Sequence, residues 1–375
     1  MARQQISRFQ FISLMTYVVM ASGILTLPHV IAQFTLQDGW MVSGVFFLGT
    51  LVAATVVAGF SRTFPGQTFI QGLKTAFGPW VGSVAGLWML AWFYIFTTIV
   101  CRELNVFVDT NISPNTPLYI TDALVVVPVT LAMVSGLESI SRLAEFINPL
   151  AILSFLMIVA LSLQNANFAQ LSPILAQGWS PVLRGGLLAA GGYALEFIVA
   201  LQLVPHLKDV QRMAKDLVYT GAVLTVLGIL TEVIAIGVLG PATRYLNFPI
   251  LEVIRIIRVG ENIERLDTVF VMGLVAAFIV KMSVLTFAGL SAVQDLVGLK
   301  STRHLSLCAP ATIWAGSVFF YRDVAVLAHY LVDVAPALFI FTLVGLPVLA
   351  MATHLLRQAL RRGGSSQASK QPAQT

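Results

Sequence analysis

Long apolar segments alternate with short polar segments along almost the whole chain. A run of about 20 apolar residues, rising 1.5 Å per residue, crosses the ~30 Å hydrocarbon core of a bilayer as a helix. The pattern therefore predicts an all-α integral membrane protein with about ten transmembrane helices. The approximate ranges are 10–34, 38–61, 79–108, 117–136, 144–164, 182–205, 217–240, 267–293, 304–320 and 333–357.

Composition supports the membrane interpretation. Of the 375 residues, 57% are hydrophobic and 10% are charged, whereas a soluble domain carries roughly 25% charged residues. The net charge of +5 does not predict nucleic-acid binding, because the basic residues are scattered between apolar runs. Cys101 and Cys308 have neither the number nor the spacing of a disulfide scaffold or metal site.

The basic residues predict the orientation. Fourteen Lys and Arg residues fall on the side of the N-terminus, six fall on the other side, and Arg102 and Lys281 lie within or at the edge of spans. The positive-inside rule then places both termini in the cytoplasm. We expect one transporter-like domain over residues 1–362, followed by a disordered cytoplasmic tail over 363–375 that is poor in apolar residues. The amphipathic segment Pro249–Arg258 predicts an interfacial helix.

Ten spans divide into two units of five, over about 10–164 and 182–357. Since five is odd, the second unit would cross the membrane in the opposite sense, as an inverted repeat. Transporters built this way bind substrate near the midplane, where the first helix of each repeat is broken. Helices 1 and 6 are therefore the places to search for a ligand site.

Both helices carry a pattern that favours such a break. In helix 1, Ser22 and Gly23 lie in mid-membrane, Thr26 follows as a candidate cap, and Pro28 suits a first helical turn. Free N–H groups at that terminus would attract a carboxylate. In helix 6, Gly191–Gly192 and Glu196 lie at the corresponding depth. Close helix packing is the alternative use of such small residues, but their matching positions in both halves favour a ligand site.

Further polar residues lie inside the predicted spans. Glu196 and Lys281 are the deepest ionisable groups, and each costs about 2.5–3.5 kcal/mol at the bilayer centre. Lys281 either replaces a coupling cation beside helix 1 or forms a structural ion pair with Glu196 or Glu232. Tyr94 and Thr98 offer a third wall for a pocket.

Two other features bear on function. Glu138, Arg142 and Glu145 predict either a cytoplasmic gate network or, as the favoured alternative, structural bracing. No phosphate loop, HExxH or GxSxG motif is present, so we expect neither an enzyme nor a bound cofactor.

Several motifs resemble one known family. Ala21-Ser-Gly-Ile-Leu-Thr-Leu-Pro28, Gly136–Pro149, Leu201–Asp209 and Ile263–Phe270 are similar to the B subunit of bacterial spore germinant receptors. That family is a branch of the amino acid, polyamine and organocation superfamily. The resemblance implies an inverted-repeat fold, sensing of a nutrient such as an amino acid in the spore inner membrane, and partnership with A and C subunits.

The resemblance also implies a ligand site. It assigns the helix 1 segment Ser22, Gly23, Ile24 and Leu25 and the helix 6 segment Tyr193, Ala194, Leu195 and Glu196, and it supports Tyr94, Thr98 and Ser283 less firmly. Gly273 departs from the family pattern, which has a large aromatic residue there.

The sequence therefore leads to a nutrient-sensing germinant receptor subunit as the first hypothesis. The alternative is a proton-coupled amino acid permease, with Glu196 or Lys281 carrying the proton. A membrane scaffold without a ligand is a third class, which the two predicted breaks argue against. The identity of the ligand depends on pocket geometry that the sequence does not contain.

Overall fold

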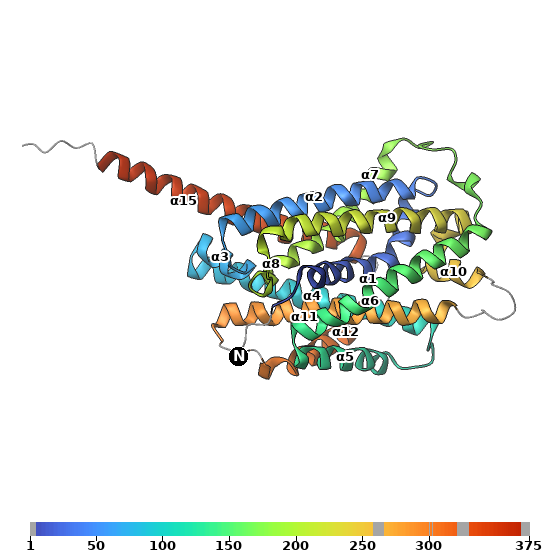
Figure 1. Ribbon diagram of the computed structural model, residues 1–375, viewed down its shortest axis with the longest axis horizontal. Helices are drawn as coiled ribbons and strands as arrows, with labels where there is room; N and C mark the ends of the chain where they lie inside the picture. The colour runs from blue at the N-terminus through green and yellow to red at the C-terminus, as the bar shows by residue number, and fades with distance from the viewer. Residues whose placement is uncertain (1–4, 258–265, 300, 302, 321–329, 369–375) are drawn as a thin grey trace, which may run out of the picture.

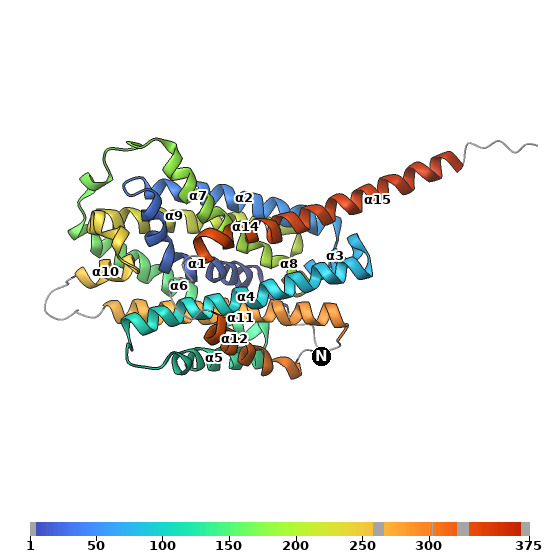
Figure 2. The same cartoon turned by 180° about the vertical axis from the view of Figure 1, so that it is seen from behind.

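The computed structural model describes residues 5–257, 266–299, 301, 303–320 and 330–368. The elements within those ranges are helices, and one isolated parallel bridge pairs Ile6 with Leu207. The long helices run side by side along the long axis of the molecule, as Figure 1 and the reverse view in Figure 2 show. This arrangement confirms the predicted all-α architecture.

The helices form two halves in which long and short helices follow one another in a corresponding order. The first contains α1 (Arg8–Phe34), α2 (Gly39–Thr63), α3 (Phe69–Phe77), α4 (Pro79–Asn111), α5 (Leu118–Ser135) and α6 (Leu137–Ser162). The second contains α7 (Trp179–Gly192), η3 (Ala194–Val199), α8 (Ala200–Leu203), α9 (Met213–Leu239), α10 (Pro249–Ile256), α11 (Leu266–Val297), α12 (Cys308–Phe320), α14 (Ala335–Phe339) and α15 (Leu346–Ala368). Short 3₁₀ and π turns join them.

The predicted spans agree with these helices. Among the described residues, nine helical stretches are long and apolar enough to cross a bilayer. The tenth, α12, has 13 residues and is apolar but shorter. It corresponds to the predicted span 304–320.

The two halves match in a way that the apolar pattern did not reveal. A short helix follows the second span of each half, α3 in the first and α10 in the second. Figure 1 shows α3 at the end of the bundle where the chain begins, here called the N-terminal end, and α10 at the opposite end. Opposite ends are what an inverted repeat requires.

The amphipathic segment predicted as an interfacial helix forms the short helix α10. It begins at Pro249, whose missing N–H suits a first helical turn. Ile250, Leu251, Val253 and Ile254 are buried against the bundle, which contacts α10 through α9, α1, α11 and α6. Arg258, the last residue of the predicted segment, lies outside the described residues.

Local sequence sets several helix boundaries. Ser7 and Gln10 form a reciprocal capping box at the start of α1, and Thr68 and Gln71 do the same for α3. Gly136 has φ +85° and by itself joins α5 to α6. A residue with a side chain would be strained in that conformation, so glycine permits the abrupt reversal.

Helix 1 does not contain the predicted break. α1 is one continuous helix from Arg8 to Phe34 with Pro28 inside it. The hydroxyl of Thr26 donates to the carbonyl of Ser22 at 2.9 Å, within its own helix, instead of capping a new one. Pro28 removes a single backbone hydrogen bond, a loss that hydroxyl side chains and neighbouring helices make tolerable in a membrane helix. The free N–H groups expected to attract a carboxylate are therefore absent from mid-α1.

Small residues bring α2 close to the second half. Gly49 packs against Ala190 of α7, where an added Cβ would lie 2.7 Å from the alanine methyl carbon. Gly186 of α7 is equally close to Val45 of α2. For these glycines, close helix packing is the correct interpretation.

A buried carboxylate holds the shorter helix α12 in place. Asp122 of α5 accepts hydrogen bonds from Asn105 of α4 at 2.6 Å and from Ser317 of α12 at 2.7 Å. Such bonds join membrane helices that gain little from the hydrophobic effect.

The last helix extends into the segment predicted as a disordered tail. α15 continues to Ala368, so part of the segment expected to be disordered is helical. Adding residues to an existing helix forms one hydrogen bond per residue without a new nucleus, which explains the extension. Residues 369–375 lie outside the described ranges.

Candidate functional site

The break predicted in helix 6, the sixth predicted span, which forms α7, η3 and α8, is present in the structure. α7 ends at Gly192, and Tyr193 leaves the helical conformation with φ −124° and ψ −48°. The chain then continues as the 3₁₀ helix η3, which carries Glu196, before α8 resumes. Gly191–Gly192 therefore marks the break, as the sequence indicated.

Four side chains from four elements meet beside this break; we call them the charged cluster. Lys281 of α11 donates to both carboxylate oxygens of Glu196, at 3.1 and 2.9 Å, and to the hydroxyl of Ser22 at 3.0 Å. Ser22 in turn donates to Glu103 of α4 at 2.6 Å. Each of these side chains is at most 5% exposed. The ammonium of Lys281 also lies 5.1 Å from the ring centre of Phe96.

A second contact ties helix 1 to the break directly. The hydroxyls of Thr26 and Tyr193 are 2.7 Å apart and share a hydrogen bond. Thr26 is one helical turn beyond Ser22, toward the end of the bundle that holds α10. Helices 1 and 6 therefore meet one residue beyond the predicted helix 1 ligand segment, although only helix 6 is interrupted.

A cavity of about 200 Å³, which we call the central cavity, leads to the contact between Thr26 and Tyr193. Its walls include Thr26, His29 and Gln33 of α1, Glu103 of α4 and Tyr193 at the break. Gln33 is exposed and Glu103 is 5% exposed, so the cavity connects the surface with the charged cluster. Along α1, the rise from Ser22 to Gln33, eleven positions later, is about 16 Å.

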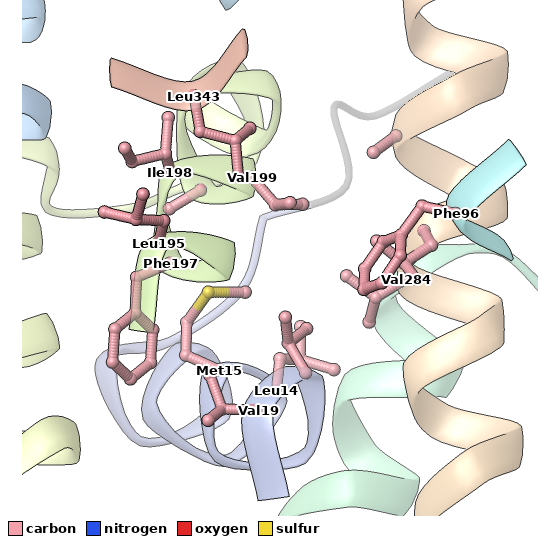
Figure 3. Close-up of a cluster of buried hydrophobic side chains, with 14 of the residues drawn as sticks. Leu14, Met15, Val19, Phe96, Leu195, Phe197, Ile198, Val199, Val284 and Leu343 are labelled. Atoms are coloured by element: carbon pink, nitrogen blue, oxygen red, sulfur yellow. The ribbon is translucent and has the colours of Figure 1, made fainter. Parts of the chain in front are cut away.

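Apolar packing closes the other side of the cluster. Figure 3 shows Leu14, Met15 and Val19 of α1 beside Leu195 and Ile198 of η3. These side chains are between 0% and 4% exposed. They separate the charged cluster from the N-terminal end, so the site faces the end that holds α10.

Comparison with known proteins identifies the family. The profile of the family described as Spore germination protein matches residues 5–323. This chain belongs to that spore germination protein family.

Individual relatives agree with this family. The chain is 27% identical over 339 residues to spore germination protein YndE of Bacillus subtilis (strain 168), covering 85% of this chain and 91% of the relative. It is 23% identical to spore germination protein A2 of the same organism, covering 84% and 86%.

Solved transporters share the fold. Mhp1, a nucleobase-cation-symport-1 family transporter in a closed conformation with bromovinylhydantoin bound, aligns with a TM-score of 0.62 at 14% identity, over 97% of this chain and 94% of that one. MhsT in complex with L-phenylalanine aligns with a TM-score of 0.58 at 16% identity, over 95% and 99%. The transporter fold predicted from the sequence is confirmed.

The helix 1 segment of this spore germination protein divides between two sides of α1. Ser22 belongs to the charged cluster, while Gly23 and Ile24 line a different cavity between α1, α2 and α9. Leu25 is buried in the core. Four consecutive residues cover a full helical turn, so a continuous helix cannot present all four to one ligand.

The helix 6 segment divides in a similar way. Tyr193 lines the central cavity, and Glu196 pairs with Lys281. Ala194 and Leu195 are buried core residues.

Tyr94, Thr98 and Ser283 do not converge on the charged cluster. Tyr94 donates to the carbonyl of Thr312 at 3.0 Å, and Thr98 packs against Gly316, so both face α12. Ser283 lies two residues after Lys281, so its side chain is rotated by about 200° around α11 relative to that of Lys281. Its buried hydroxyl has no hydrogen-bond partner among the described residues. At Gly273, a Cβ would meet no atom within 4 Å outside its own helix backbone, and this residue is not part of the wall of the central cavity.

The three residues predicted as a gate network or, as the favoured alternative, as structural bracing divide into two separate contacts. Arg142 and Glu138 form an exposed ion pair at 2.7 Å within α6. Glu145 instead accepts from Gln10 of α1 at 2.8 Å. A helix places residues 138 and 142 on one face but turns residue 145 toward α1, so the three do not form one gate.

Other contacts hold the N-terminal end together. The N–H of Ile6 donates to the carbonyl of His206 at 2.9 Å, and Arg8 pairs with Asp216 at 2.7 Å. Asp295 of α11 accepts from Thr68 and Gln71 of α3, each at 2.6 Å, and from Gln202 of α8 at 2.9 Å. These contacts brace the end of the bundle that the central cavity does not reach.

Glu103 is the functional candidate that sequence reasoning missed. It follows Arg102 near the end of the predicted span 79–108, where charged residues are ordinary interfacial features. The structure extends α4 to Asn111 and buries Glu103. An ionisable residue five positions inside a predicted span was the available signal.

Proposed function

We propose that this chain is the nutrient-sensing subunit of a spore germinant receptor and binds an amino acid in the central cavity. The observation that carries the proposal is a surface cavity ending on the buried charged cluster at the helix 6 break. Membership of the spore germination protein family and the shared fold with MhsT in complex with L-phenylalanine support it.

Charge supports a ligand with an ammonium group. Two carboxylates, Glu103 and Glu196, share one cation, Lys281, so the ionised cluster has a net charge of −1. Lys281 donates hydrogen bonds to Glu196. Among the described residues, Glu103 accepts a hydrogen bond from the hydroxyl of Ser22, and it forms part of the cavity wall. An ammonium group placed on Glu103 would complete the charge balance with a strong charge-assisted hydrogen bond.

Sensing requires a conformational change rather than bond chemistry, so the proposed protein is not an enzyme. The ligand ammonium competes with Ser22 for Glu103, which weakens the link between α1 and α4. The ligand thereby favours a different arrangement of α1 by its differential affinity for the two states. We propose that A and C subunits receive this change, in the spore inner membrane, with both termini in the cytoplasm.

A proton-coupled amino acid permease is the second candidate. It is favoured by the buried pair of Lys281 and Glu196, 2.9 Å apart between α11 and the break. Protonation of Glu196 would release Lys281 and loosen both elements, which is how a proton could drive a transport cycle.

The decisive experiment measures binding and uptake of radiolabelled amino acids by the purified protein in liposomes. It is done with and without an imposed proton gradient. Saturable binding without accumulation is expected for the sensor. Accumulation that depends on the gradient would favour the permease, and no binding of any amino acid would contradict both.

The Glu103→Gln variant tests the role of the cavity carboxylate. Hydrogen bonds to charged groups contribute about 1.5–3 kcal/mol, so affinity for the bound amino acid should fall roughly tenfold to hundredfold. Glu138→Gln removes an exposed carboxylate far from the cavity and should leave affinity unchanged. Equal affinities of Glu103→Gln and wild type would contradict the proposed ammonium contact.

Germination of spores that lack a partner subunit tests the proposed receptor assembly. Deletion of the A or C partner should abolish the nutrient response that depends on this chain. A normal response in such spores would rule out the receptor proposal while leaving ligand binding intact.

A further inference from the structure

A second cavity, of about 80 Å³, lies on a different face of α1 from the charged cluster. It runs between α1, α2 and α9, and most of its wall is apolar. On α1 its wall extends from Val19 to Ile31, about 18 Å along the helix, and on α9 from Leu224 to Glu232, about 12 Å. A cavity this long and this small in volume is narrow and suits a slender chain. We call it the α1–α9 cavity.

Glu232 lies at one end of this cavity and is 3% exposed. One of its carboxylate oxygens lies close to Gly39, the first residue of α2: an added Cβ on Gly39 would stand 3.0 Å from that oxygen and 3.1 and 3.3 Å from the side chains of Ile31 and Ile236. Among the described residues Glu232 has no hydrogen bond or ion pair, and the cavity wall contains no Lys, Arg or His. Burying a carboxylate without a partner is costly, so this end of the cavity is electrostatically incomplete.

The two polar neighbours do not supply the missing partner. Thr231 donates its hydroxyl to the carbonyl of Leu227 at 2.8 Å. Ser43 faces Gly228, where an added Cβ would stand 2.9 Å from its hydroxyl oxygen. The remaining wall is formed by side chains such as Met20, Ile24 and Phe46, which offer only apolar contact.

We propose that the α1–α9 cavity binds an amphipathic primary amine. Its ammonium group pairs with Glu232, and its unbranched apolar chain lies along α1 and α9 toward Phe46. The charge of Glu232 selects the cationic head group, since a carboxylate and an ammonium form a strong charge-assisted hydrogen bond. The narrow apolar walls select the chain. This site is separate from the central cavity and does not depend on the proposed amino acid ligand.

The test uses the full-length protein in phosphatidylcholine nanodiscs, whose zwitterionic lipid does not itself concentrate amines. The probe is a ten-carbon primary alkylamine that carries a photoreactive diazirine in its chain. Irradiation should label peptides of α1 and α9. At equal membrane concentrations, n-octylamine should suppress the labelling at least tenfold, whereas n-octanol, with the same chain and no charge, should leave most of it.

The Glu232→Gln variant should reduce the labelling of α1 and α9 at least tenfold. Glu138→Gln, which changes an exposed carboxylate, is the matched control and should label like wild type. Equal suppression by octylamine and octanol in the wild type would overturn the proposal. Labelling spread over lipid-facing helices, or undiminished in Glu232→Gln, would overturn it too. If Glu232→Gln does not fold, the wild-type competition alone decides.

Discussion

Ser22 connects the two charged halves of the buried cluster. Its hydroxyl accepts a hydrogen bond from Lys281 and donates one to Glu103, at 3.0 and 2.6 Å. A serine is small enough to be enclosed by these groups and has both a donor and an acceptor. One residue of α1 therefore contacts α4 and α11 together, and any ligand that displaces it changes both contacts.

Lys281 is the only cation of this cluster among the described contacts, so its removal should be destabilising. Lys281→Met leaves two buried carboxylates without compensation, which we expect to lower the free energy of unfolding by about 3–5 kcal/mol. Combining it with Glu196→Gln removes part of the excess negative charge and should recover part of the loss. Thermal unfolding of the purified variants in detergent measures both effects.

A matched control exists on the surface. Arg142→Met also removes a cation from an ion pair, but that pair is exposed at the surface of α6. Exposed pairs contribute about 0–1 kcal/mol, so its unfolding temperature should stay close to that of wild type. Similar losses for Lys281→Met and Arg142→Met would contradict the importance assigned to burial.

At the scale of elements, α3 acts as a brace between the two halves. Asp295 of α11 accepts hydrogen bonds from Thr68 and Gln71 of α3 and from Gln202 of α8. Lys74 adds a hydrogen bond to the backbone carbonyl of Asp295 at 2.6 Å. Three elements that are far apart in the sequence thus depend on one carboxylate.

Asp295→Ala should therefore loosen α3. Loss of charged hydrogen bonds worth about 1.5–3 kcal/mol each should make amide hydrogen exchange in Phe69–Phe77 at least tenfold faster. Asp209→Ala is the control, because Asp209 is also an acidic residue at this end but its contacts, a cap of the short turn η5 and an ion pair with Arg212, stay within its own segment. Unchanged exchange in α3 of Asp295→Ala would show that α3 is held by its apolar side chains alone.

At the scale of the whole molecule, the two ends differ. The central cavity reaches the surface near Gln33, whereas apolar packing and the contacts of α3 close the N-terminal end. A transporter fold can alternate between such states, and this structure has the end that holds α10 open.

Cysteine labelling can test this asymmetry. In a Cys308→Ala background, which removes the exposed native thiol, Gln33→Cys should react quickly with a water-soluble maleimide. Met15→Cys, buried on the N-terminal side of the cluster, should react at least a hundredfold more slowly. Comparable rates at both positions would show that the N-terminal end also opens to water.

The sequence by itself determined the architecture. Each apolar run must satisfy its backbone hydrogen bonds internally in a bilayer, so its length and position predict a helix with little ambiguity. The break at Gly191–Gly192 was equally readable, because paired glycines weaken a helix locally whatever surrounds them. The motif resemblance also identified the family.

Tertiary structure alone decided how the site is assembled. Whether α1 breaks at Pro28 depends on contacts such as that of Thr26 with Tyr193, which no local pattern contains. Glu103 and Lys281 are 178 positions apart in the sequence, and only packing brings each to Ser22. Helix periodicity determines which residues share a face. The neighbouring helices determine whether that face lines a cavity, packs in the core or lies on the surface. For this reason Ser22 and Gly23 lie at different sites, as do Glu196 and Glu232.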